Sequence, residues 1–172
     1  NGEIFSGSHG LGRQAGHMKV GRNFYHCTCG GNGCLETFAS GTALVTYYKH
    51  RRELIIKAGG DIPPAYRSAK KIFMAAADNE PVADEAFRRF VHYLGIGVAN
   101  LIDILDPEVI AIGGGLSKAG DQLLLPLQHK IAEQVYDAKR MSVQLTIASL
   151  GNEAGMIGSA MYARRKINEN SG

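Results

Sequence analysis

The architecture of the N-terminal quarter depends on the segment Cys27-Thr28-Cys29-Gly30-Gly31-Asn32-Gly33-Cys34. Three cysteines fall within these eight residues, and so crowded an odd number makes a poor disulfide framework. Upstream, His17 adds one imidazole to the three potential thiolates, and this set matches the four ligands of a closed structural zinc site. A closed site has no open position for water, so hydrolysis by this metal is not expected. The predicted zinc ligands are His17, Cys27, Cys29 and Cys34; the alternative is ordinary buried thiols beside a hydrogen-bonded histidine.

The flanking sequence predicts an irregular loop that only such a metal would hold together. Residues 12–34 are rich in Gly, His and Cys and lack a long apolar period, although a short strand is expected near residues 17–20. The interleaved glycines permit the sharp turns that let Cys29 and Cys34 face one ion. Upstream, residues 1–11 predict a hairpin that begins with an Asn-Gly turn signal and resembles the end of a cut element. No chemical role is assigned to His9, His26 or His50.

Helices dominate the next part of the chain, and they are expected at residues 35–49, 64–77 and 83–105. In the last of these, apolar residues recur at intervals of three and four, which is the spacing of one buried helix face. This core face consists of Phe87, Phe90, Val91, Leu94, Val98, Leu101, Ile102 and Leu105. Residues 58–64, rich in Gly-Gly and Pro-Pro, are expected to join two helices within one domain.

Strands and helices then alternate. Asp106-Pro107 ends the long helix, because the residue before a proline is steered away from the α region. The expected elements are a buried strand at 109–112 before a Gly113-Gly114-Gly115 turn, a helix at 126–136 with Pro126 in its first turn, a β-branched strand at 143–148 and a helix at 154–167. This order predicts an α/β fold with parallel strands and helical cover.

Length, composition and charge exclude several classes of protein. A chain of 172 residues, 45% of them hydrophobic, can bury one core, so residues 1–172 are expected to form a single domain. No apolar stretch reaches the length of a membrane span and no charged-then-apolar leader opens the chain, which predicts a soluble, cytoplasmic protein without a membrane partner. The net charge of +3 is too small, and the basic residues too dispersed, for a nucleic-acid partner.

Three motifs resemble the ROK family of sugar kinases and sugar-responsive repressors. The first joins Gly16-His17-Met18-Lys19-Val20 to the cysteine segment and its continuation Leu35-Glu36-Thr37-Phe38-Ala39-Ser40. The second, similar to the strand and glycine turn near the family's nucleotide, is Asp106-Pro107-Glu108-Val109-Ile110-Ala111-Ile112-Gly113-Gly114-Gly115-Leu116-Ser117. The third, which resembles the family's closing helix, is Leu150-Gly151-Asn152-Glu153-Ala154-Gly155-Met156-Ile157-Gly158-Ser159-Ala160. The three motifs stand in the same order as in the family, and the resemblance extends over almost the whole chain.

The resemblance implies the C-terminal lobe of an actin-like, ribonuclease-H-like ATPase fold, with an inserted zinc-binding loop at about residues 12–36. In this family two lobes close on sugar and ATP. The family's phosphate loop, of the form Asp-x-Gly-Gly-Thr, and its catalytic aspartate belong to the N-terminal lobe, upstream of this chain. No catalytic residue is therefore assigned here, the absent lobe is an expected partner, and the chain by itself is expected to be inactive.

The resemblance also implies contacts to ligands. His17 would bind zinc through one ring nitrogen and offer the other to a sugar hydroxyl, and Glu36 would accept hydrogen bonds from sugar hydroxyls. The family's Glu-x-Gly-His reads Gln14-Ala15-Gly16-His17 here, so Gln14 stands in the substrate site with an amide instead of a charge. Glu36 has an alternative reading as an exposed first-turn glutamate. The implied nucleotide contacts are Gly113, Gly114, Gly115 and Gly155, with Gly158 serving either the nucleotide or close helix packing.

The implied function is the sugar- and nucleotide-binding part of an ATP-dependent kinase acting on a hexose or N-acetylhexosamine, of the glucokinase, fructokinase or N-acetylglucosamine kinase type. Its cofactors would be structural zinc and, in the full-length protein, ATP with Mg²⁺; a homo-oligomer is expected. One alternative is the effector-binding part of a ROK-type repressor, which binds sugar without phosphorylating it. Another is a zinc module that binds neither ligand. An upstream phosphate loop would favour the kinase, and an upstream DNA-binding segment the repressor.

Overall fold

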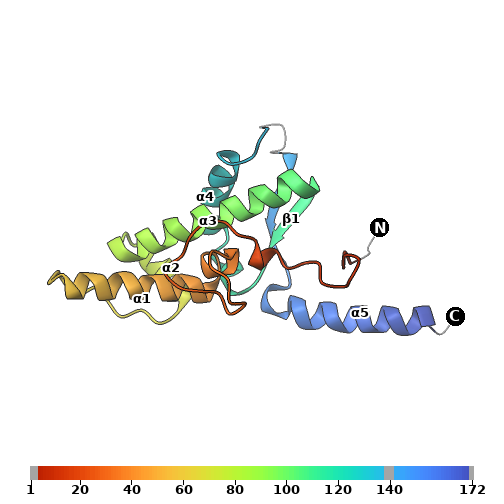
Figure 1. Cartoon of the computed structure of the whole chain (residues 1–172), viewed down its shortest axis with the longest axis horizontal. Helices are drawn as coiled ribbons and strands as arrows, with labels where there is room; N and C mark the ends of the chain where they lie inside the picture. Colours follow the sequence, from red (N-terminus) through yellow and green to blue (C-terminus); the bar gives the residue numbers. More distant parts are fainter. Residues whose placement is uncertain (1–3, 138–141, 171–172) are drawn as a thin grey trace.

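Figure 1 shows the computed structural model, which describes residues 4–137 and 142–170. Helices make up most of it, with a small sheet near the C-terminal third. The main elements in chain order are the 3-10 turns η1 (Ala15–His17) and η2 (Leu35–Thr37), the helices α1 (Gly41–Lys57), α2 (Ala69–Ala77) and α3 (Pro81–Leu105), the strand β1 (Val109–Ile112), the turn η3 (Gly115–Ala119), the helix α4 (Asp121–Ala132), the strand β2 (Gln144–Ile147), the turn η5 (Gly151–Glu153) and the helix α5 (Ala154–Asn170).

The core lies where α3 packs against α1, α2 and α4. Its buried side chains on α3 include Phe90, Val91, Val98 and Ile102, which confirms the predicted apolar face for these residues. Leu105 is an exception, since 61% of this residue is exposed in the last turn of the helix. The periodicity therefore predicted which side of α3 is buried, but not where the burial stops.

The two strands pair in parallel, with Val109 opposite Gln144 and Ile112 opposite Ile147. Between them the chain passes through α4, which contacts both α3 and β2, so the predicted α/β crossover with parallel strands is confirmed. β1 has the predicted bounds, and β2 is one residue shorter than predicted at each end. β1 is half exposed rather than buried, because β2 is its only partner among the described residues.

Serine caps make two helices begin later than predicted. The Ser40 hydroxyl accepts a hydrogen bond from the Ala43 amide, and α1 therefore begins at Gly41 rather than near residue 35. The Ser68 hydroxyl accepts one from the Lys71 amide in the same way, and α2 begins at Ala69 rather than near residue 64. The predicted connection at 58–64 does join these two helices, within the longer irregular segment 58–68.

The prediction for α4 was wrong at its start. This helix begins at Asp121, so Pro126 lies inside it rather than in the first turn. Proline has no amide hydrogen to donate to the carbonyl four residues earlier, but the rest of the helix is retained. Leu123, Leu127 and Ile131 on its inner face are buried in the core, and this apolar packing outweighs the loss of one helical hydrogen bond.

Two short predicted β elements are absent from the described residues. Residues 4–11 contain no strand; instead, the Gly12 amide donates to the Ser6 carbonyl at 2.9 Å and closes a small loop. The other part of the predicted hairpin, residues 1–3, lies outside the described residues. The strand expected near residues 17–20 is reduced to an isolated antiparallel bridge between Lys19 and Cys34, next to η1. A strand this short has too few ladder bonds to persist as a separate element.

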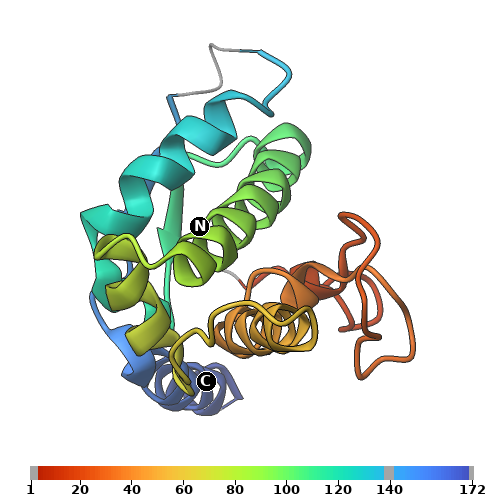
Figure 2. The ribbon, with the colours of Figure 1, turned by 90° about the vertical axis from the view of Figure 1, so that its left-hand side faces the viewer.

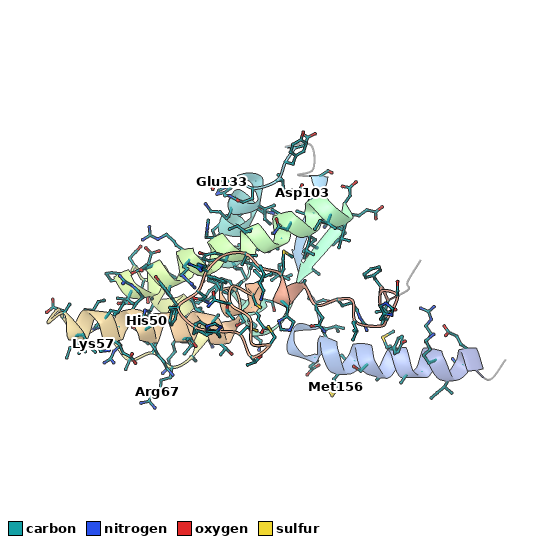
Figure 3. The ribbon with its side chains drawn as sticks, viewed as in Figure 1. His50, Lys57, Arg67, Asp103, Glu133 and Met156 are labelled. Carbon is teal, nitrogen blue, oxygen red and sulfur yellow. The ribbon has the colours of Figure 1, made fainter. Side chains whose placement is uncertain are left out.

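α5 projects away from the packed helices, as Figure 1 shows. Figure 2, turned by 90°, places the N-terminal loop on one side of α1 and α4 on the other. Met156, labelled in Figure 3 on the first turn of α5, is 71% exposed. None of the helices in residues 4–137 and 142–170 has both the length and the apolar character that a membrane crossing requires.

Candidate functional site

The structure brings the four predicted metal ligands together. One potential ligand atom each from His17, Cys27, Cys29 and Cys34 lies within 4.8 Å of all the others. The sulfur atoms of Cys29 and Cys34 are 3.6 Å apart, and His17 Nδ1 lies 3.7 Å from Cys27 Sγ. Cys27 and Cys34 are buried whereas Cys29 is exposed, so the cluster lies at the edge of the loop rather than in the core.

These separations fit a tetrahedral zinc ion. Two sulfurs bound to one zinc at about 2.3 Å each lie about 3.8 Å apart in a tetrahedron, close to the separation between Cys29 and Cys34. The donor set of one imidazole and three thiols also suits zinc better than a hard cation such as Mg²⁺. Since the ring faces Cys27 through Nδ1, the other ring nitrogen of His17 is left for a different partner.

Tight turns in the cysteine segment create this geometry. The Cys27 amide donates to the Gly31 carbonyl at 2.8 Å, the Gly30 amide donates back to the Cys27 carbonyl at 2.9 Å, and Gly30 has a φ of +85°. Gly33 has a φ of +88° and packs directly against the Gly21 backbone. Two glycines therefore adopt the left-handed region that side chains disfavour, and the chain reverses between the cysteines.

Replacing Gly33 is expected to disrupt the cluster. A Cβ at this position would lie 1.9 Å from the Gly21 carbonyl oxygen, so Gly33→Ala requires the backbone to move. Gly30→Ala is the matched control, because Gly30 has a similar positive φ but no atom within 4 Å of the added carbon. We expect Gly33→Ala to lose metal and lower the melting temperature, and Gly30→Ala to cost only about 1 kcal/mol of backbone strain. Metal analysis with thermal denaturation checks this; equal behaviour of the two variants contradicts it.

Two charged side chains contact the sulfur atoms. Lys19 Nζ donates to Cys34 Sγ at 2.8 Å, and this contact raises the pKa of the Lys19 ammonium. Cys27 Sγ lies 2.7 Å from Glu36 Oε1, and the hydrogen bond to this carboxylate raises the pKa of the Cys27 thiol to about 11. Coordination of a metal requires the thiolate, so the proton shared by Cys27 and Glu36 has to leave. The Lys19 ammonium offsets part of the negative charge of three thiolates.

Glu36 and His17 lie next to each other at the cluster. His17 Nδ1 is 3.7 Å from Glu36 Oε1, and both side chains are partly exposed. Gly16 leaves room for Glu36, since a Cβ there would lie 3.5 Å from its Oε2. Gln14 is exposed at the start of η1, and no side-chain hydrogen bond of the described residues joins it to Glu36. The structure thus brings the side chains of His17 and Glu36 together, whereas Gln14 is joined to His17 through its backbone carbonyl, which accepts from the His17 amide at 2.9 Å.

Glu36 lines a polar cleft of about 360 Å³ beside the cluster. The other polar residues of this cleft are Tyr25, His26, Cys27, Thr28, Thr37, Ser40 and Thr42. Hydroxyl groups both donate and accept hydrogen bonds, so the lining suits a ligand that carries several hydroxyls of its own. Among the described residues that line it, Glu36 is the only acid.

A second cleft, of about 320 Å³, contains the predicted glycine turn. Gly113, Gly114 and Gly115 line it opposite Ser40 and Gly41 at the start of α1. Ser40 therefore lines both clefts, and the two are neighbours across the N-terminus of one helix. Gly155 does not line either cleft; it is exposed near the start of α5, with no atom within 4 Å of an added Cβ.

Sequence reasoning missed two residues that support the first cleft, Asn23 and Arg89. The Asn23 amide group donates to the Thr37 carbonyl at 2.8 Å, and Arg89 donates to Asn23 Oδ1 at 3.0 Å. A signal for Arg89 was present, since it lies three residues after buried Ala86 and thus on the apolar face of α3. A cation at such a position needs a partner, but the sequence does not identify Asn23, 66 residues away.

The histidines left without a chemical role stay outside the metal cluster. His26 is exposed, although it lines the polar cleft, and its backbone bridges to Asn32. The His50 ring on α1, labelled in Figure 3, stacks on Phe24 with ring centroids 4.1 Å apart. This contact connects Phe24, three residues before Cys27, to the first long helix.

Comparison with known proteins finds similarity to one family and, within the curated proteins, to sugar kinases and sugar repressors. Residues 1–166 match the model of the ROK family. The chain is 35% identical over 165 residues to a glucokinase of Streptomyces coelicolor, covering 92% of this chain and 52% of that protein. It is 29% identical to a xylose repressor of Caldicellulosiruptor bescii, covering 91% of this chain and 40% of the repressor.

The fold agrees with these sequence matches. A crystal structure of a ROK family glucokinase from Streptomyces griseus, in complex with glucose and AMPPNP, superposes with a TM-score of 0.75 at 31% identity. The superposition covers 91% of this chain and 52% of that one. The chain therefore spans about half the length of the glucokinases that it matches.

Proposed function

This chain belongs to the ROK family, and from that membership we propose that it is the C-terminal, sugar- and nucleotide-binding part of an ATP-dependent sugar kinase. The observation that carries the proposal is the adjacency of the two clefts at Ser40. A phosphoryl-transfer enzyme has to hold a hydroxyl and a nucleotide side by side, because positioning and charge neutralisation supply most of its catalysis. The glucokinase structure that contains glucose and AMPPNP supports this pairing of ligands.

The polar cleft is proposed to bind the sugar. The Glu36 carboxylate accepts hydrogen bonds from two neighbouring hydroxyls, and the second nitrogen of His17 contacts another. His17, Cys27, Cys29 and Cys34 hold structural zinc, which when bound fixes the tautomer and direction of the His17 ring. The hydroxyls of Thr28, Ser40 and Thr42 complete a hydrogen-bonding surface suited to a hexose or an N-acetylhexosamine.

The glycine cleft is proposed to contact the nucleotide. The ligands proposed for the full-length protein at this cleft are ATP and Mg²⁺. Gly114 has a φ of +82° and no atom within 4 Å of an added Cβ, so its backbone is open to a close ligand. Gly155 does not line the glycine cleft. It is included in this proposal because it follows η5, and η5 contacts η3 at the end of the glycine turn. The catalytic base and the phosphate loop are assigned to the half of the parent protein that lies outside this chain.

A ROK-type repressor is the second candidate, and Gln14 is the observation that favours it. A neutral amide at the position of the family's glutamate weakens hydrogen bonds to a sugar relative to a carboxylate, which suits a sensor more than a kinase. The similarity to a xylose repressor is consistent with this alternative. The purified parent protein is incubated with sugar and ATP, and phosphorylation is measured as release of ADP. Release of ADP favours the kinase, whereas sugar binding without release of ADP favours the repressor.

Removing the Glu36 carboxylate tests the sugar site in the parent protein. We expect Glu36→Ala to weaken sugar binding by about 1.5 to 3 kcal/mol, the range for hydrogen bonds to charged groups. Glu53→Ala is the matched control, because Glu53 is exposed on α1, outside the residues that line both clefts. Calorimetry with glucose and N-acetylglucosamine measures both variants. An unchanged affinity in Glu36→Ala overturns the assigned role. Gln14→Glu is expected to leave the fold intact and either to strengthen sugar binding or to redirect it to another sugar.

A further inference from the structure

A half-buried arginine on α3 connects this helix to the proposed sugar site. The guanidinium of Arg89 lies over three aromatic rings, with its central carbon 4.6 Å from the centroid of Phe38, 4.3 Å from that of Tyr47 and 5.1 Å from that of Tyr93. These rings come from three separate parts of the chain, namely the end of η2, α1 and α3 itself. The cation is therefore enclosed by an aromatic box that also holds these elements together.

The charge of Arg89 has no carboxylate partner among the described residues. No ion pair in residues 4–137 and 142–170 involves it, and burial lowers the pKa of its guanidinium while the nearby tyrosines raise it. Its hydrogen bond goes instead to a neutral acceptor, Asn23 Oδ1, at 3.0 Å. Burial of a cation is costly unless its hydrogen bonds are satisfied, so this bond helps to orient the Asn23 side chain, whose Oδ1 also accepts from the Phe24 amide at 3.0 Å.

The Asn23 side chain also holds the backbone next to Glu36 in place through a hydrogen bond. Asn23 Nδ2 donates to the Thr37 carbonyl at 2.8 Å, and the Tyr25 hydroxyl donates to the same oxygen at 2.7 Å. The Thr37 hydroxyl in turn donates to the Cys34 carbonyl at 2.7 Å. Thr37 follows Glu36 directly in η2 and is buried, so these bonds fix the short turn from which the Glu36 carboxylate extends.

From this chain of contacts we propose that Arg89 is a positioning residue of the sugar site, acting through Asn23 and the Thr37 carbonyl on the direction of Glu36. The proposal rests on the proposed function of Glu36. Arg89 itself touches neither the sugar cleft nor the zinc ligands, since it does not line that cleft and its contacts are the aromatic box and Asn23. Its effect should therefore fall on sugar binding and spare the nucleotide.

The experiment compares variants of two adjacent arginines of α3. In the full-length parent protein, Arg89→Gln removes the cation and its bond to Asn23, whereas Arg88→Gln removes an exposed pair with Asp84. We expect Arg89→Gln to raise the Kd and the KM for sugar about tenfold or more, as for other residues that orient a ligand-binding group. The KM for ATP and the zinc content stay unchanged, and Arg88→Gln behaves as the parent. Calorimetry measures the sugar Kd, steady-state kinetics the two KM values, and elemental analysis the zinc content.

A second variant covers the case in which Arg89→Gln does not fold. Asn23→Asp has nearly the same size and keeps an acceptor for Arg89, but it places a carboxylate oxygen opposite the Thr37 carbonyl in place of the Nδ2 donor. We expect the same loss of sugar affinity, and no further loss when both substitutions are combined in a folded protein. An unchanged sugar Kd in either folded single variant, or equal rises of the KM for sugar and for ATP, overturns the positioning role. A parent that neither binds nor phosphorylates any sugar instead contradicts the proposed function, and the positioning role with it.

Discussion

Removal of zinc is expected to release residues 12–36 while the packed helices stay folded. The segment has little regular structure, namely η1, two isolated bridges and the start of η2. The main core between α1, α2, α3 and α4 contains none of the proposed metal ligands. Structural zinc contributes about 10–16 kcal/mol of apparent binding free energy in zinc-finger peptides, so chelation removes the largest single stabilising interaction proposed for this segment.

Hydrogen exchange after chelation measures the effect amide by amide. The amides of Val20, Cys27 and Leu35 donate within this segment to the carbonyls of Gly33, Gly31 and Met18, so they should lose protection. Amides in the middle of α3 should keep theirs. Elemental analysis should find about one zinc ion per chain before chelation.

Variants of two histidines distinguish loss of the metal site from general destabilisation of the fold. His17→Ala removes a ligand and is expected to leave substoichiometric zinc after dialysis, as is Cys27→Ser. His26→Ala is the control, because His26 is next to Cys27 in the sequence but its side chain is not part of the cluster. A metal-free, fully ordered protein, or a Cys27→Ser variant as stable as the parent, contradicts the zinc site.

The second large effect is that this chain alone is expected to phosphorylate no sugar, even if its parent is an active kinase. Phosphoryl transfer requires hydroxyl, base, metal and γ-phosphate in line, and errors of about 1 Å can cost roughly a hundredfold. Glu36 is the only acid among the described residues that line the two clefts, and its proposed task is to bind.

Two other acids of the packed helices, Glu80 and Glu85, already have structural partners. Glu80 accepts hydrogen bonds from the Val82 and Ala83 amides and caps α3. Glu85 accepts from the Tyr47 hydroxyl and from Arg51, and burial together with the former bond raises the pKa of Tyr47 to about 12. These carboxylates stabilise helices and are not free to act as a base for a bound sugar.

A coupled assay of ADP release over a panel of hexoses and N-acetylhexosamines tests this expectation, with the full-length parent as the positive control. The isolated chain should give the rate of the blank, while calorimetry still detects weak sugar binding. Turnover that co-purifies with the isolated chain and disappears in His17→Ala would show that one of its own carboxylates acts as the base, and the assignment of the base to the missing half would then be wrong.

The sequence by itself determined the features that depend on local spacing. The ligand set could be chosen because three cysteines within eight residues, broken by glycines, can reach one point without help from the rest of the chain. The bounds of β1 and the buried face of α3 followed from apolar patterns for the same reason. The starts of α1 and α2 were also readable in principle, since a serine that caps the helix precedes each.

Tertiary structure decided what depends on residues far apart in the chain. Ser40 lines both clefts only because the fold brings the turn after β1 and the start of α1 to the same cleft, and Arg89 reaches Asn23 only because α3 contacts η2. Gln14 and Gly155, which the family resemblance placed in the sites, are exposed and line neither cleft. Spacing along a chain specifies distances within a turn or a helix, whereas the meeting of distant segments is set by how the whole core packs, and no local pattern encodes that.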